Sequence, residues 1–125
     1  MVGKTASVTT TVTDKNTAKA VGSGNLDVFA TPMMIALMEQ AACECLADSL
    51  EPGQTSVGTQ INVAHTAASP LGATITATAT ITQAEGRKVS FTVTANDDTN
   101  EIGSGAHGRF IIDAERFMSK LEQRK

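Results

Sequence analysis

One long apolar segment, residues 31–47, most constrains how this chain can fold. It reads TPMMIALMEQAACECLA and is followed closely by the turn-forming sequence EPG. A threonine followed by proline and then by good helix formers is typical of a helix start. We therefore predict that Thr31 caps a helix that begins at Pro32 and runs over residues 32–47.

The predicted helix is apolar nearly all round. Its strongly polar side chains are Glu39, Gln40 and Glu44, which do not form one solvated stripe at about 100° per residue. Such a helix is expected to be buried. Because a buried carboxylate needs a partner or a raised pKa, Glu39 is the first candidate functional residue.

Length and composition exclude several classes of protein. A chain of 125 residues can bury a core as one domain, residues 1–125, without disulfides. A net charge of −3, four phenylalanines and no tryptophan or tyrosine argue against nucleic acid as a partner. No apolar run is long enough to span a bilayer, and the N-terminus lacks the apolar core of a signal peptide. We expect a cytoplasmic protein with no membrane partner.

The two cysteines are not expected to perform chemistry. Cys43 and Cys45 are rotated by about 200° from each other on a helix, so they can neither form a disulfide nor share a metal. Their expected role is to fill a reduced core as small apolar side chains. Since the His, Cys and carboxylate positions lack ligand spacing, no metal site is predicted.

Alternating apolar and polar residues predict five strands. They cover residues 5–14, 55–68, 73–83, 88–95 and 101–112. The sequences PLG and EGR are predicted to form turns, and the glycines of the last strand indicate a bulge or a close backbone approach. A short amphipathic helix is expected at the C-terminus, residues 113–125, and a loose loop that covers a pocket at residues 15–27.

The second predicted strand carries a candidate base. Its alternation places His65 on the core side, together with Val57 and Thr59, and turns Gly58 to the opposite face. One strand, one apolar helix and four further strands indicate an α+β protein, with an antiparallel sheet laid over a helix.

Several motifs then occur in the order and separation typical of one family. They are GTQINVAHTAASP at residues 58–70, EGR at 85–87, EIGSGAH at 101–107, and Ala30-Thr31 with Glu39 eight residues on. Over residues 28–117 the chain resembles the hot-dog-fold thioesterases of the fluoroacetyl-CoA thioesterase-like group.

The resemblance implies a five-stranded antiparallel sheet wrapped around one central apolar helix. It also implies a homodimer whose sheets pair edge to edge, an acyl-CoA site at the dimer interface and no cofactor. The catalytic set of such enzymes falls here on Thr31, Glu39 and His65, with Gly58 supplying a backbone amide and Arg109 lining the acyl pocket.

One segment departs from the family. The group's best-known member carries an aromatic-rich lid before the helix, whereas residues 21–27 are short and Gly-rich here. Phe29 is the aromatic residue next to this segment and is expected to contact substrate. The acyl group, fluorinated or not, stays open.

Each candidate residue also has a plain structural explanation. His65 can act as a base or as a hydrogen-bonded core residue; Glu39 can act as a nucleophile, orient His65 or form an ion pair. Thr31 can be a simple cap. On one helix Thr31 and Glu39 differ by about 12 Å of rise and about 80° of rotation. We therefore hypothesise that each site takes Glu39 from one subunit and Thr31 from the other.

The leading functional hypothesis is a homodimeric thioesterase that hydrolyses a small acyl-CoA. The alternative is a non-catalytic hot-dog domain that binds acyl-CoA or another small ligand. An enoyl thioester hydratase is less favoured, because the central helix has no histidine beside its acid. His107 is expected at the surface or on a strand face rather than on substrate, and Arg109 either clamps an anionic ligand or forms a surface salt bridge.

Overall fold

The computed structural model describes residues 1–124. Five strands surround one long helix, with three short helical segments. The elements in chain order are β1 (Thr5–Thr11), α1 (Ala18–Val21), α2 (Thr31–Leu46), η1 (Ala47–Ser49), β2 (Gln54–His65), β3 (Thr74–Glu85), β4 (Lys88–Asn96), β5 (Glu101–Asp113) and α3 (Ala114–Glu122). The α+β class is confirmed. The predicted C-terminal helix is shorter than expected, and its last residue, Lys125, lies outside the described residues.

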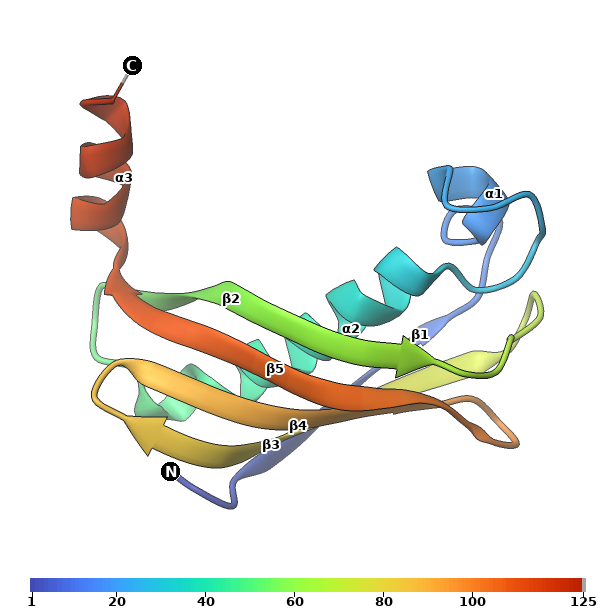
Figure 1. Ribbon diagram of the computed structural model, residues 1–125, viewed down its shortest axis with the longest axis horizontal. Helices are drawn as coiled ribbons and strands as arrows, with labels where there is room; N and C mark the ends of the chain where they lie inside the picture. The colour runs from blue at the N-terminus through green and yellow to red at the C-terminus, as the bar shows by residue number, and fades with distance from the viewer. Residues whose placement is uncertain (125) are drawn as a thin grey trace.

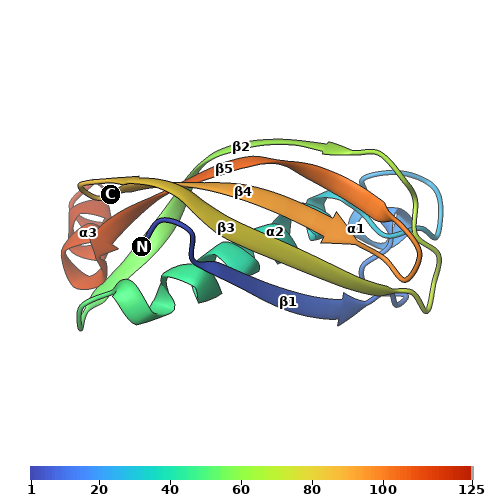
Figure 2. The ribbon, with the colours of Figure 1, turned by 90° about the horizontal axis from the view of Figure 1, so that it is seen from below.

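The strands form one antiparallel sheet in the order β1-β3-β4-β5-β2. The sheet curves around α2, which lies along its concave side (Figure 1, Figure 2). β1 and β2 form its two edges, so each has one side without a strand partner within residues 1–124. The predicted turns are confirmed at Gly72 and Gly86, both of which have positive φ.

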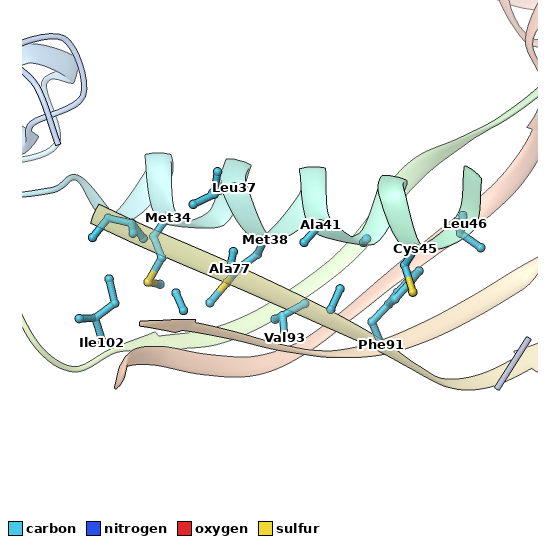
Figure 3. Close-up of a cluster of buried hydrophobic side chains, with 14 of the residues drawn as sticks. Met34, Leu37, Met38, Ala41, Cys45, Leu46, Ala77, Phe91, Val93 and Ile102 are labelled. Atoms are coloured by element: carbon cyan, nitrogen blue, oxygen red, sulfur yellow. The ribbon is translucent and has the colours of Figure 1, made fainter. Parts of the chain in front are cut away.

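The core lies between α2 and the concave face of the sheet. It is made of apolar side chains from both layers, among them Met34, Leu37, Met38, Ala41, Cys45, Leu46, Ala77, Phe91, Val93 and Ile102 (Figure 3). The other face of β1, β3 and β4 carries mostly threonine, and hydroxyls pair across its strands, as with Ser7 Oγ and Thr78 Oγ1 at 2.7 Å. The two faces of these strands therefore differ, since one packs on α2 and the other is lined with hydroxyls.

The start of α2 differs from the prediction. Ala30 occupies the cap position without a side-chain hydrogen bond, and Thr31 is the first helical residue. The predicted role of Thr31 as the cap is wrong, because its hydroxyl bonds to the side chain of His65 instead. The end at Leu46 lies one residue before the expected boundary, and η1 continues the chain.

A register shift in β2 overturns the predicted faces of its first half. Gly58 pairs with Arg109, but Gln60 pairs with the next residue along β5, Gly108. This bulge at Thr59 reverses the alternation before it, since one extra residue exchanges the two faces. Gly58, rather than Thr59, therefore faces α2, while the prediction that His65 lies on the core side is confirmed because it follows the bulge.

Other boundaries differ in smaller ways. β1 ends at Thr11, and the segment expected to be loose contains α1, which Thr17 caps through a hydrogen bond from the Ala20 amide. Cys45 is buried as predicted, but Cys43 is exposed, so the expectation that both fill the core is wrong for Cys43. No helix within residues 1–124 is long and apolar enough to cross a membrane.

Candidate active site

The first turn of α2 brings a hydroxyl against an imidazole. Thr31 Oγ1 lies 2.7 Å from Nδ1 of His65, the last residue of β2. Together with Phe29, Ala67 and Ala68, this pair lines a hollow of about 270 Å³. Phe29 is only 1% exposed, so it forms a buried part of the wall.

The environment of His65 suits a proton acceptor. Burial lowers the pKa of the imidazole below its usual 6.5, while the backbone of Ala67 acts in the opposite direction. Its Nε2 atom is buried and has no hydrogen-bond partner of good geometry within residues 1–124. The ring is therefore neutral near pH 7 and keeps one basic nitrogen, as a general base requires.

A second group of polar residues lies further along α2. Glu39, Ser56, Gly58, His107 and Arg109 are here called the Glu39 cluster. Arg109 Nη1 donates a hydrogen bond to Glu39 Oε2 at 2.9 Å, with the arginine side chain 8% exposed and the glutamate side chain 41% exposed. A cation this deeply buried needs a charged partner, so Arg109 fixes the position of the carboxylate. It is not the surface salt bridge considered from the sequence.

The absence of a side chain at Gly58 lets the Glu39 carboxylate lie against the backbone of β2. A Cβ atom at this position would lie 2.5 Å from Glu39 Oε2 and 3.4 Å from Arg109 Nη1. Gly58 and Glu39 line a second hollow, of about 230 Å³, to which Ile35 and Ile61 contribute apolar walls. The geometry thus brings the predicted residues Glu39, Gly58 and Arg109 together.

The two groups do not meet within one chain. Thr31 and His65 line one hollow, Glu39 and Gly58 line another, and these hollows share no residue. Thr31 and Glu39 are separated by eight helical positions, about 12 Å along the axis. One subunit therefore presents the predicted catalytic set in two parts.

Of the Glu39 cluster, Ser56 was not singled out from the sequence, and His107 was expected at the surface or on a strand face. Ser56 accepts from Arg109 Nε at 2.8 Å through its hydroxyl, and His107 is 3% exposed rather than at the surface. The glycines at 103, 105 and 108 obscure the alternation of β5, so its sequence carried no sign that His107 faces inward. Within residues 1–124, no group of three or more His, Cys, Asp or Glu is arranged to hold a metal ion.

A model of the fluoroacetyl-CoA-specific thioesterase family matches residues 12–115 of the chain. This chain belongs to that family. The curated fluoroacetyl-CoA thioesterase of Streptantibioticus cattleyicolor is 49% identical over 98 residues, which cover 78% of this chain and 70% of that protein.

Solved structures support the same assignment. A solved structure of a fluoroacetyl-CoA thioesterase is 40% identical, covers 100% of this chain and 97% of its own, and superimposes with a TM-score of 0.93. A hot-dog-like protein from Thermanaerovibrio acidaminovorans is 26% identical, covers 98% of this chain and 91% of its own, and gives a TM-score of 0.89. The hot-dog fold and the assignment to the acyl-CoA thioester hydrolases are therefore confirmed.

Proposed function

We propose that this thioesterase hydrolyses a small acyl-CoA to the free acid and CoA, with Thr31, Glu39 and His65 as its catalytic residues. The observation that carries the proposal is the 2.7 Å contact between the Thr31 hydroxyl and Nδ1 of His65. We propose that the Thr31 hydroxyl holds the neutral imidazole in the orientation in which it can take a proton from an attacking water.

The reaction adds water across the thioester. In one route a water oxygen attacks the carbonyl carbon and passes its proton to His65; the C–S bond then breaks, and the CoA sulfur takes up a proton. In the other route the Glu39 carboxylate attacks first and the C–S bond breaks to release CoA as the thiolate; water then hydrolyses the resulting anhydride and frees Glu39, and His65 passes the proton of that water to the CoA sulfur. In the second route Glu39 must stand at the carbonyl carbon, whereas in the first it must orient the attacking water; in both, the backbone amide of Gly58 is proposed to stabilise the oxyanion.

We further propose a homodimer in which each site combines Thr31 and His65 of one subunit with Glu39 of the other. The free edge of β2 supports this assembly, because its sequence, QTSVGTQINVAH, contains none of the lysines or prolines that usually protect an edge strand. The outer side of α2 supports it too. A hollow of about 590 Å³ lies there beside Glu39 and is lined in part by Ala36 and Cys43. This hollow is not covered by other parts of the same chain.

The size of the second hollow favours a short acyl group. It has a volume of about 230 Å³ with Ile35 and Ile61 in its wall, which suits a short apolar acyl group beside Glu39. Fluoroacetyl-CoA, the substrate named for the relatives, is one candidate. The segment before α2 supplies no aromatic lid, since Phe29 is buried and residues 21–27 contain none, so we propose that unfluorinated short acyl groups are also accepted.

The test is release of free thiol from acetyl, propionyl, branched, aromatic and fluoroacetyl CoA esters, followed with a thiol-reactive dye. His65→Ala is the matched variant, checked for folding by far-UV circular dichroism because the chain has no tryptophan or tyrosine. Release that depends on His65 supports the catalytic assignment and ranks the acyl groups. Binding of the esters without release would instead favour the non-catalytic alternative.

A further inference from the structure

His107 lies inside the Glu39 cluster, where the proposed chemistry gives it no task. It is the residue of β5 that pairs with Ile61 on β2 and with Phe91 on β4. Its ring stacks on Phe91, with the ring centres 5.8 Å apart and an interplanar angle of 28°. Only 3% of the residue is exposed, so both ring nitrogens must find their partners within the protein.

The two neighbours of the imidazole fix its tautomer. Nδ1 lies 2.7 Å from the carbonyl oxygen of Gln60, which can only accept, so Nδ1 carries the proton. Nε2 lies 3.2 Å from Nη1 of Arg109, which can only donate, so Nε2 presents its lone pair. The neutral form with hydrogen on Nδ1 satisfies both contacts at once.

The guanidinium of Arg109 is held on two sides. Ser56 accepts from Nε at 2.8 Å through its hydroxyl and from Nη2 at 3.1 Å through its carbonyl. On the opposite side, the two N–H groups of Nη1 donate to Nε2 of His107 and to Oε2 of Glu39, the latter at 2.9 Å. The direction in which Nη1 meets the carboxylate therefore depends on the lone pair of His107.

We propose that His107 is a positioning residue: it acts through Arg109 to hold the Glu39 carboxylate in its reactive orientation. This inference rests on the proposed catalytic role of Glu39. Two charged groups face the ring of His107: Arg109, on the same strand, and Glu39 on α2, whose Oε2 lies 4.0 Å from Nε2. The neighbours from the other strands are uncharged, since β4 contributes Phe91 and β2 contributes the Gln60 carbonyl. Protonation would place an N–H against the guanidinium and remove the acceptor. Burial chiefly, helped by the nearby Arg109, lowers the pKa of His107 against the opposing effects of the Gln60 carbonyl and Glu39, so the ring is neutral near pH 7.

Two substitutions separate the nitrogens. In His107→Gln the side-chain oxygen can take the place of Nε2 and accept from Arg109, while the donor to Gln60 is lost. In His107→Asn the amide nitrogen can take the place of Nδ1 and donate to Gln60, while the acceptor for Arg109 is lost. Both variants lose the stacked ring, and Asn is one methylene shorter than Gln.

The expected result is a difference in kcat between the two variants. His107→Asn should lower kcat by about ten- to a hundredfold, because the hydrogen bond that it loses is to a charged group, with KM changed by less than about threefold. His107→Gln should keep kcat within about threefold of the wild-type value, whichever of the two variants has the lower melting temperature. Equal kcat values in both variants, or a lower kcat in His107→Gln, would overturn the proposal and leave His107 with a purely structural role.

A second measurement does not depend on turnover. Long-range ¹H–¹⁵N correlation spectra of the labelled protein at neutral pH should show Nδ1 of His107 protonated and Nε2 unprotonated. The opposite tautomer or a doubly protonated ring would refute the arrangement even if acyl-CoA hydrolysis is confirmed. Conversely, an inactive wild-type protein with the expected tautomer would count against the proposed function and not against the contact between His107 and Arg109.

Discussion

Glu39 and Arg109 carry opposite charges at very different depths in the protein. The arginine is almost fully buried, while the glutamate side chain is 41% exposed and opens onto a hollow. The arginine thus depends on the glutamate for its partner, whereas the glutamate stays accessible to substrate. Removing the charge of Glu39 and removing its hydrogen bond should consequently have different effects.

Glu39→Gln should abolish turnover and leave the fold nearly intact. The amide is close in shape to the acid and its oxygen can still accept from Arg109, but it is neither a base nor a nucleophile. We expect kcat to fall by at least about a hundredfold, measured as thiol release. Wild-type rates in this variant would exclude Glu39 from catalysis.

Glu39→Ala is the matched control for that variant. It leaves the buried Arg109 without this acceptor and should lower the free energy of unfolding by about 1–3 kcal/mol, measured by urea denaturation. Both variants should be inactive, and only the alanine variant should be clearly less stable. Equal stability would mean that water replaces the carboxylate without cost.

The pH dependence of activity should follow His65. Because burial lowers its pKa, the ring stays neutral until the pH falls below the usual 6.5, and the base is lost as the pH drops through that lowered value. We expect kcat/KM to be constant from neutral pH down to about pH 6.5 and then to decrease. An acid limb centred above pH 6.5 would contradict the buried, uncharged imidazole.

At the scale of elements, the sequence predicted α2 to within one residue at each end, because an apolar run between strong boundary signals leaves few alternatives. The predicted faces of the first half of β2 were wrong, because the bulge at Thr59 could not be recognised from the sequence. Glycine, threonine and glutamine, which surround it, occur on either face of a strand. Ser56 also faces inward although polar, because it serves Arg109. The contacts of Arg109 and His107 arise from pairing between β2, β4 and β5 and could not be predicted from one strand alone.

Glycines in β5 provide a direct test of packing. A Cβ atom on Gly103 would lie 2.6 Å from Met34 Sδ and 2.7 Å from the Ala64 carbonyl, whereas one on Gly108 would have its closest neighbour at 3.4 Å. Gly103→Ala should therefore lower the free energy of unfolding by about 1–3 kcal/mol. Gly108→Ala is the control on the same strand and should change it by less than about 0.5 kcal/mol. Thermal melts of the two variants side by side would decide, and equal effects would contradict the close approach of α2 to β5.

At the scale of the whole molecule, the proposed sharing of sites predicts complementation. Glu39→Gln and His65→Ala should each be inactive alone, but in a mixed dimer one site would receive both defects and the other neither. After unfolding and refolding an equal mixture, half the dimers should be mixed, and activity should reach roughly a quarter of the wild type. No recovery, with mixed dimers shown to form, would place Glu39 and His65 of one chain in the same site.

The separation of Thr31 and His65 from Glu39 has a consequence for how the enzyme behaves at low abundance. Under the proposed arrangement, Thr31 and His65 lie in one hollow and Glu39 in another, so a single 13.0 kDa chain cannot complete a turnover. At chain concentrations below the dimer dissociation constant, the hydrolysis rate should then be proportional to the square of the chain concentration rather than to the concentration itself. A newly made chain would be inactive until it forms a dimer, so thioesterase activity in the cell would rise more steeply than the amount of protein.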